Sequence, residues 1–194
     1  MMKMPGSSLS AIPNFILCGF MGCGKSTVGK HLAKITGLPF VDMDTYIENR
    51  QGKKIRAIFE EEGEEAFRAM ETRAAEELSR QTGQIIASGG GTVLRAENRN
   101  VLRKTGTILL LDVPFPALRE RLKRDTTRPL LQRPDREEAM KALYEQRMPL
   151  YLEAADIVIP AGAPCSVVAG RILDACGLSS FSEAAQKPSL QERP

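Results

Sequence analysis

The stretch GFMGCGKST, which runs from Gly19 to Thr27, constrains the fold of this chain more than any other segment. It follows the apolar run NFILC, which has strand length, and leads into a segment with helical periodicity. The spacing GxxxxGK[ST] of a P-loop is matched by Gly19, Gly24, Lys25 and Ser26. Glycines let backbone N–H groups turn toward phosphate oxygens, and the positive end of the following helix points to the same place. We therefore predict a phosphate site between a strand and a helix, where Lys25 reaches the terminal phosphates and Ser26 ligates Mg²⁺.

Strand-like and helix-like segments alternate along the rest of the chain. Apolar runs of strand length lie at residues 14–19, 38–44, 84–88, 107–113 and 155–160. Periodicity and helix-ending signals predict helices at 25–36, 44–62 (broken near 52), 64–82, 96–104, 114–123, 135–153 and 166–176. This alternation predicts an α/β fold of three layers, in which a five-stranded parallel sheet lies between helices.

The composition narrows the domain organisation and the possible partners. We expect a single domain at residues 14–177, a flexible segment at 1–13 and a disordered tail at 178–194. A net charge of +3 and 5% aromatic residues argue against nucleic-acid binding. We find neither an apolar run of the roughly 18–20 residues that a membrane span needs nor a signal peptide. The four cysteines form no CxxC pair, so we expect free thiols in a cytoplasmic, monomeric protein.

Two carboxylates end the second predicted strand in the segment FVDMD. Asp42 and Asp44 therefore lie at the edge of the sheet where ligands of α/β proteins bind. Asp42 could hold the metal shell, directly or through water. Asp44 could orient an acceptor hydroxyl or accept its proton; the alternative is a structural role as the N-cap of the next helix.

Two arginines are candidates for binding an anionic substrate. Arg68 and Glu71 are neighbours on a helix flank, where they form either a surface ion pair or a support that aims the arginine at a ligand. Arg147 lies on the buried stripe of a later helix, three residues after Tyr144. Because an unpaired inward guanidinium is unfavourable, we favour a bound carboxylate over an internal ion pair.

Two further segments, one rich in glycine and one rich in arginine, indicate a cleft for a ligand. Ser88–Gly91 (SGGG) ends the third predicted strand, and its glycines allow close approach of a ligand to the backbone, although a mobile turn has the same pattern. Residues 124–136 contain four arginines and two prolines. This composition is typical of a lid that closes over phosphates, or alternatively of a solvated basic loop.

Chain length and missing motifs favour a small kinase among P-loop proteins. The Asn-Lys-x-Asp element of regulatory GTPases is absent, and ATP-driven motors need a larger chain. Asp112, which ends the run ILLLD, has the position of a Walker B carboxylate and is the alternative to Asp42 beside the metal.

These motifs together resemble those of shikimate kinases, within the nucleoside-monophosphate-kinase-like P-loop group. The matching segments, in family order from about residue 14 to 174, are GFMGCGKSTVGKHLA, FVDMD, IRAIFEEEGEEAFRAMET, ASGGGTVL, RPLL and RMPLY. The resemblance implies ATP-dependent phosphorylation of the 3-hydroxyl of shikimate, in chorismate and aromatic amino-acid biosynthesis, with Mg²⁺ as cofactor. It also implies the sheet order 2-3-1-4-5, a substrate-binding segment at about 44–72 and a lid at about 124–136.

The resemblance also assigns residues to ligands. ATP phosphates would be bound by Gly22, Cys23, Gly24, Lys25, Ser26, Thr27 and the lid residue Arg128. Shikimate would be bound by Asp44, Arg68, Gly89, Gly90, Gly91 and Arg147, with Glu71 supporting the arginine site. Ser26 and Asp42 would lie on the metal side, which favours Asp42 over Asp112. The catalytic residues would be Lys25, Asp44 and Arg128.

One departure from the family pattern and three rival functions stay open. The segment IPAGAPCS at residues 159–166 has a proline where the family commonly has an acidic residue, so Arg124 is a candidate for contacting the base. A gluconate kinase would carry a His-Pro element after the second strand, which is absent here. A nucleotide kinase would need a base-reading pocket in place of paired arginines. A non-catalytic nucleotide-binding module would not need the intact set of Lys25, Ser26, Asp44 and Arg147.

Overall fold

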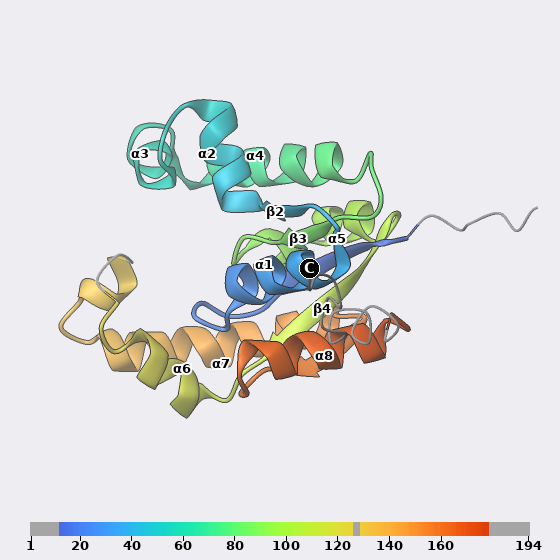
Figure 1. Cartoon of the computed structure of the whole chain (residues 1–194). Helices are drawn as coiled ribbons and strands as arrows, with labels where there is room; N and C mark the ends of the chain where they lie inside the picture. Colours follow the sequence, from blue (N-terminus) through green and yellow to red (C-terminus); the bar gives the residue numbers. More distant parts are fainter. Residues whose placement is uncertain (1–11, 126–128, 179–194) are drawn as a thin grey trace, which may run out of the picture.

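Five short strands form one parallel sheet in the order β2-β3-β1-β4-β5 (Figure 1). The computed structural model describes residues 12–125 and 129–178. The strands are β1 Asn14–Cys18, β2 Phe40–Asp42, β3 Ile85–Ala87, β4 Gly106–Asp112 and β5 Ile157–Pro160. In the register, Ile16 of β1 lies between Ile86 of β3 and Ile108 of β4. These three isoleucines are fully buried, as expected of central strands with both faces covered. The predicted fold class and strand order are confirmed.

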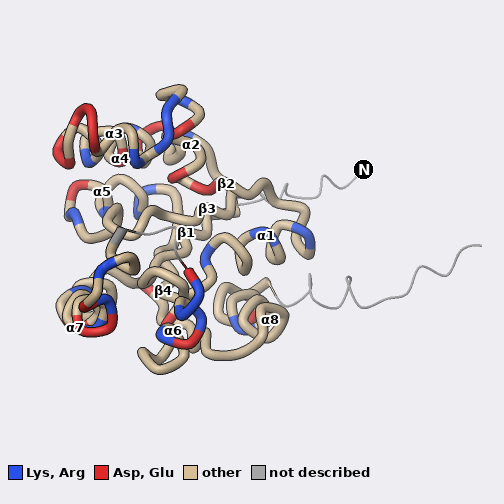
Figure 2. Tube along the Cα trace, turned by 90° about the vertical axis from the view of Figure 1, so that its left-hand side faces the viewer, with Lys and Arg blue, Asp and Glu red and all other residues tan. Residues whose placement is uncertain are grey.

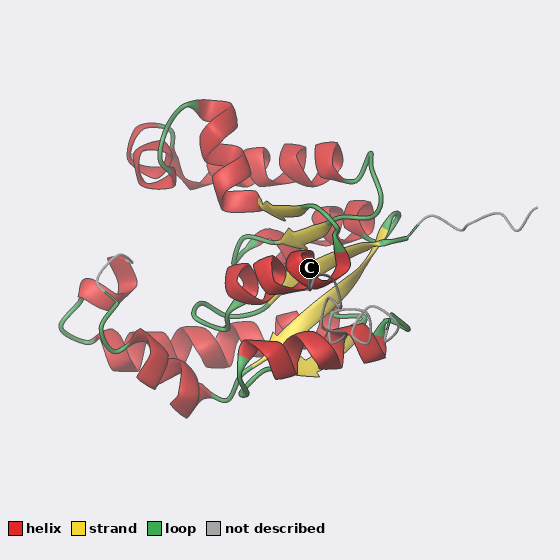
Figure 3. Cartoon of the chain, viewed as in Figure 1, coloured by secondary structure: helices red, strands yellow, loops and turns green. Residues whose placement is uncertain are grey.

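Helices cover both faces of the sheet and one of its edges (Figure 3). The helices are α1 Lys25–Thr36, α2 Met43–Gln51, α3 Ile55–Glu61, α4 Gly63–Leu78, α5 Ala96–Leu102, α6 Phe115–Leu122, α7 Arg136–Ala154 and α8 Cys165–Ala175, with 3₁₀ turns η1 Thr92–Leu94 and η2 Pro129–Gln132. Figure 2 shows α1 and α8 on one face, α5 and α7 on the other, and α2–α4 beyond the β2 edge. Among the described residues, none of the helices combines the length and apolar character that a bilayer crossing requires.

Two predicted element boundaries are wrong. Asp44 does not end a strand, because α2 begins at Met43, where the Asp42 side chain accepts the N–H groups of Asp44 and Thr45. The helix predicted to continue to Thr82 ends at Leu78, whose carbonyl accepts a hydrogen bond from Nε2 of Gln84 at 3.1 Å. Beyond this end, Nδ2 of Asn14 donates to the Gln81 carbonyl at 2.7 Å.

The carboxyl ends of β1, β2 and β3 meet at one edge of the sheet. Because the strands are parallel and adjacent, the segments that follow them are brought side by side. These segments are the P-loop after β1, the start of α2 after β2 and the glycine turn Gly89–Gly91 after β3. The fold therefore assembles three of the predicted site segments in one place.

Candidate functional site

The P-loop has the backbone conformation that its glycines predict. Gly19, Gly22 and Gly24 have φ angles of 135°, 76° and 100°, a region that side chains other than glycine rarely adopt. Gly24 is the N-cap of α1, so the positive end of that helix faces the loop. The Lys25 ammonium group folds over the loop and donates to the Gly19 carbonyl at 2.8 Å. The loop is thus shaped as an anion cradle with one cation inside it.

Asp42 joins the P-loop helix to α2. The Ser26 hydroxyl donates to Oδ2 of Asp42 at 2.6 Å. Oδ1 of Asp42 accepts the backbone N–H groups of Asp44 and Thr45 at 3.1 and 3.3 Å, so Asp42 is the N-cap of α2. The alternative that Asp44 caps this helix is therefore wrong. Asp112 is not among the residues that line the cavity beside Ser26.

Asp44 lies half-buried beside other acidic groups. Burial, followed by the charges of Asp42 and Glu71, raises the pKa of Asp44 to about 6. The positive charge of Lys25 lowers the pKa of Asp44, but by less than burial and the two carboxylates raise it. A carboxyl group with this pKa is mostly ionised at pH 7 and remains a competent proton acceptor.

Arg68 is held by a buried carboxylate on one side and by an exposed one on the other. Nη1 of Arg68 contacts Oε2 of Glu71 at 2.6 Å, and the Glu71 side chain is only 1% exposed. The Thr92 hydroxyl donates to the other oxygen of Glu71 at 2.5 Å. Glu64 holds Nη2 of Arg68 at 2.9 Å from the solvent side. Both oxygens of Glu71 are thus occupied, and the guanidinium is fixed beside the glycine turn.

The absence of side chains at Gly89–Gly91 allows charged groups to approach this turn. A Cβ atom added at Gly89 would lie 2.7 Å from Oε1 of Glu71 and 2.9 Å from Oδ1 of Asp44. A Cβ atom added at Gly91 would overlap the Arg68 guanidinium. Two carboxylates and an arginine are therefore packed against a backbone that only glycine provides.

Helix α7 brings a second arginine to the same turn. Nη1 of Arg147 lies 3.8 Å from the place of a Cβ atom at Gly90. The buried Tyr151 hydroxyl donates to the Gly90 carbonyl at 2.5 Å. Arg147 is half-buried, which agrees with the predicted inward stripe.

A cavity of about 520 Å³ extends from the P-loop to the start of α2, the glycine turn and α7. It is lined by Met21, Gly22, Gly24, Lys25, Ser26, Thr27, Asp42, Asp44, Ser88, Gly90, Arg121, Leu122, Asp125 and Arg147. Most of the predicted site residues therefore line one space. Arg68 is not part of this lining and approaches the glycine turn at Gly91 instead.

Arg121 is a residue of this region that the sequence did not single out. Its guanidinium donates to the carbonyls of Cys23 and Ala161 at 3.3 and 3.2 Å. It also lines a second cavity of about 340 Å³, together with Pro164 and Cys165 of the segment in which we looked for base contacts. Arg124, which the sequence suggests for contact with the base, does not line that cavity.

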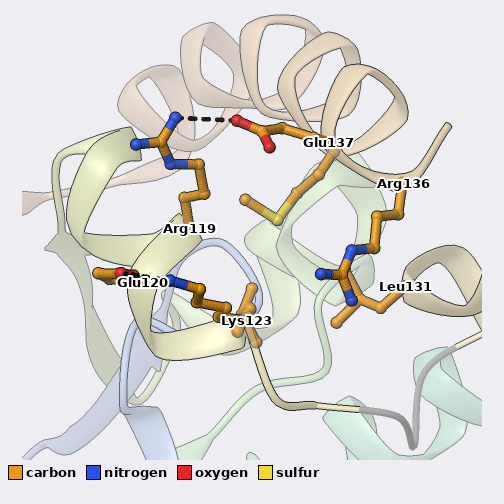
Figure 4. A pocket seen from close by; sticks show the side chains of 8 residues that line it. Arg119, Glu120, Lys123, Leu131, Arg136 and Glu137 are labelled. Atoms are coloured by element: carbon orange, nitrogen blue, oxygen red, sulfur yellow. Dashed lines mark hydrogen bonds and ion pairs between the residues drawn. The ribbon is translucent and has the colours of Figure 1, made fainter.

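A third cavity lies between α6, η2 and α7 (Figure 4). The ion pair of Arg119 with Glu137 crosses one side of it at 2.8 Å, and Leu122 separates it from the P-loop. The predicted lid residue Arg128 lies outside the described residues.

Comparison with known proteins identifies the family. The family model for shikimate kinase matches residues 21–176 of this chain. This chain belongs to the shikimate kinase family. A shikimate kinase from Psychrobacter cryohalolentis is 45% identical over 151 residues, covering 78% of this chain and 81% of the relative.

Solved structures of shikimate kinases have the same fold. The enzyme from Acinetobacter baumannii in complex with shikimate has a TM-score of 0.75 and 38% identity, and the match covers 91% of this chain and 96% of that one. The enzyme from Bacteroides thetaiotaomicron has a TM-score of 0.79 and 30% identity, with 87% and 100% covered. The sheet order and the position of the P-loop in this chain are thus those of shikimate kinases.

Proposed function

We propose that this protein transfers the γ-phosphoryl group of ATP to the 3-hydroxyl of shikimate, giving shikimate 3-phosphate and ADP. The observation that carries the proposal is the glycine turn, where Asp44, Arg147 and Arg68 lie beside Gly89, Gly90 and Gly91. Asp44 and Arg147 also line the cavity that contains the P-loop. Two guanidinium groups suit a carboxylate, and an aspartate suits a hydroxyl. Membership of the shikimate kinase family supports the same substrate.

On the nucleotide side, the residues Gly22 to Thr27 would hold the phosphates with backbone N–H groups and the Lys25 ammonium. The Ser26 hydroxyl and the Asp42 carboxylate lie 2.6 Å apart, and such hard oxygen donors fit Mg²⁺. Mg²⁺ bound there would neutralise charge on the phosphates. Among the described residues, no group of three or more His, Cys, Asp and Glu side chains could hold a metal ion, so phosphate oxygens and water would complete the coordination begun by Ser26 and Asp42.

On the acceptor side, Arg68 and Arg147 would bind the shikimate carboxylate, and Gly89–Gly91 would leave room for its ring. Asp44 would orient the 3-hydroxyl and accept its proton as the hydroxyl oxygen bonds to phosphorus. The bond from phosphorus to the bridging oxygen breaks in line, and ADP leaves with that electron pair. Arg128 would approach the phosphates from the lid at residues 124–136, and Lys25 would stabilise the transferred group.

The cavity lined by Arg121, Pro164 and Cys165 is our candidate for the nucleotide base. It borders Gly22 and Gly24 of the P-loop, so a nucleotide whose phosphates fill the loop could extend into it. A single domain at 14–177, a monomeric state and a cytoplasmic location remain predictions.

A coupled ADP-release assay tests the proposal with shikimate, gluconate and nucleoside monophosphates as separate acceptors. We expect turnover that depends on Mg²⁺ with shikimate and rates near background with the other two. Preference for gluconate or a nucleotide, or ATP binding without turnover of any acceptor, would contradict the proposal.

A further inference from the structure

Tyr151 is a buried polar side chain that none of the roles above uses. It lies on α7 one turn after Arg147, and it is 1% exposed. Its hydroxyl donates to the Gly90 carbonyl at 2.5 Å. Burial raises the pKa of Tyr151, against the smaller opposing effects of Lys25 and Arg147. The hydroxyl therefore stays protonated and remains a hydrogen-bond donor at neutral pH.

Backbone hydrogen bonds fix only part of the glycine turn: the Gly89 and Gly91 carbonyls accept the N–H groups of Thr92 and Leu94 at 3.3 and 3.0 Å, and the Gly90 carbonyl is bonded by a side chain instead. Three consecutive glycines have wide backbone freedom, which is lost when the turn adopts one conformation. The flanking residues are fixed: Ser88 donates to the Leu17 carbonyl at 3.1 Å, and Thr92 donates to Glu71. Within residues 12–125 and 129–178, Tyr151 is the one side chain that hydrogen-bonds the backbone of the turn itself.

Fixing the Gly90 carbonyl fixes the peptide that follows it. The peptide unit is planar and trans, so the direction of the carbonyl also sets the direction of the Gly91 N–H group. Arg147 and Tyr151 are four residues apart and share one face of α7. Both lie near Gly90, at 3.8 and 4.0 Å from the place of its missing Cβ atom. One turn of α7 thus places Arg147 beside the glycine turn and lets the Tyr151 hydroxyl bond the Gly90 carbonyl.

We propose that Tyr151 is a positioning residue, whose hydroxyl holds the Gly90 peptide in the conformation that receives the acceptor beside Arg147. The inference rests on the proposed function, because the acceptor is taken to be shikimate. Tyr151 touches no reacting atom in this account. Without the hydroxyl, the turn samples more conformations, and substrate binding has to order it. Acceptor binding should therefore weaken, while the P-loop is unaffected.

The kinetic test compares Tyr151→Phe with Tyr144→Phe. Tyr144 is the matched control, because it lies on the same helix and its ring packs against Phe20 and Phe115, while no contact with a ligand is assigned to it. For Tyr151→Phe we expect the shikimate KM to rise about tenfold, equivalent to ~1.4 kcal/mol, as for one lost hydrogen bond. The ATP KM and kcat should stay within about twofold. Tyr144→Phe should leave the shikimate KM unchanged. An unchanged shikimate KM in Tyr151→Phe, or a parallel rise in both KM values, would overturn the inference.

Amide hydrogen exchange in the ligand-free protein separates this inference from the proposed function. The amides of Thr92 and Leu94 donate to the Gly89 and Gly91 carbonyls at 3.3 and 3.0 Å, so they report the order of the turn. We expect their exchange to be about tenfold faster in Tyr151→Phe, and unchanged in Tyr144→Phe. If the wild-type protein failed to phosphorylate shikimate, the proposed function would be wrong, and faster exchange would still support the anchoring of the turn. If shikimate were turned over but the exchange rates of Tyr151→Phe matched those of the wild type, the function would stand and the inference would fail.

Discussion

Replacing Glu71 should damage both the stability of the fold and the binding of the acceptor. Its two oxygens accept from Nη1 of Arg68 at 2.6 Å and from the Thr92 hydroxyl at 2.5 Å, in a position that is 1% exposed. In Glu71→Ala, the hydroxyl loses its partner, and the guanidinium keeps only Glu64 on the solvent side.

The burial of Glu71 sets the expected loss in the free energy of unfolding. Breaking one side of a buried ion pair costs about 3–5 kcal/mol, which is a large share of the ~5–15 kcal/mol that stabilises a domain. Glu71→Gln keeps one acceptor oxygen and replaces the other with a donor, so we expect a smaller loss of about 1–3 kcal/mol. In Glu71→Ala the buried contact that aims Arg68 at the glycine turn is lost, and in Glu71→Gln it is weakened. The shikimate KM should therefore rise in both variants, and more in Glu71→Ala.

Urea unfolding followed by circular dichroism measures the stability, since the chain has no tryptophan for fluorescence. The matched control is Glu76→Gln, an exposed glutamate on the same helix, for which a change within about 0.5 kcal/mol is expected. If Glu71→Gln and Glu76→Gln unfolded at the same urea concentration and had the same shikimate KM, the supporting role of Glu71 would be refuted.

Three further changes test other parts of the site. Asp44→Asn should abolish turnover yet stabilise the metal-free protein. The folded-state pKa of Asp44, about 6, lies above its ordinary value of 3.8, so stability present below pH 3.8 is lost as the pH rises through 6. The difference of about two pKa units corresponds to ~3 kcal/mol. Unfolding in chelator should therefore show the variant to be more stable at pH 8 but not at pH 3, and equal stability at pH 8 would contradict the burial of this charge. Arg147→Ala should raise the shikimate KM roughly 10- to 100-fold and preserve nucleotide affinity by calorimetry; an unchanged KM would count against carboxylate binding. In Gly91→Ala, the new methyl group would overlap the Arg68 guanidinium, so the shikimate KM should rise, whereas Gly170→Ala, which adds a methyl group in open space, should leave the kinetics unchanged.

Local sequence signals predicted the fold well because they act over short distances. The P-loop glycines require positive φ angles, and the apolar run of β4 requires cover on both faces, so both could be recognised from composition and spacing. The end of α4 could not, because the Gln84 side chain takes the Leu78 carbonyl that a helix continuing to Thr82 would have used, and Asn14 of β1 bonds the segment just beyond it.

The positions of candidate site residues could be predicted where a motif carries its own chemistry, and could not where they depend on tertiary contact. Lys25, Asp42 and Arg147 lie where their motifs indicated. Glu71 could be paired with Arg68 from their spacing, but its complete burial and its bond to Thr92 could not be foreseen. Arg121 is one of two arginines on α6, and only the fold shows that it contacts the P-loop backbone.

A crystal structure with shikimate and ADP tests the central claim most directly. We expect the shikimate carboxylate within hydrogen-bonding distance of both the Arg68 and the Arg147 guanidinium groups, and the 3-hydroxyl facing Asp44 and the phosphate end of the P-loop. A structure in which the carboxylate binds elsewhere, with both arginines turned away from it, would contradict the account.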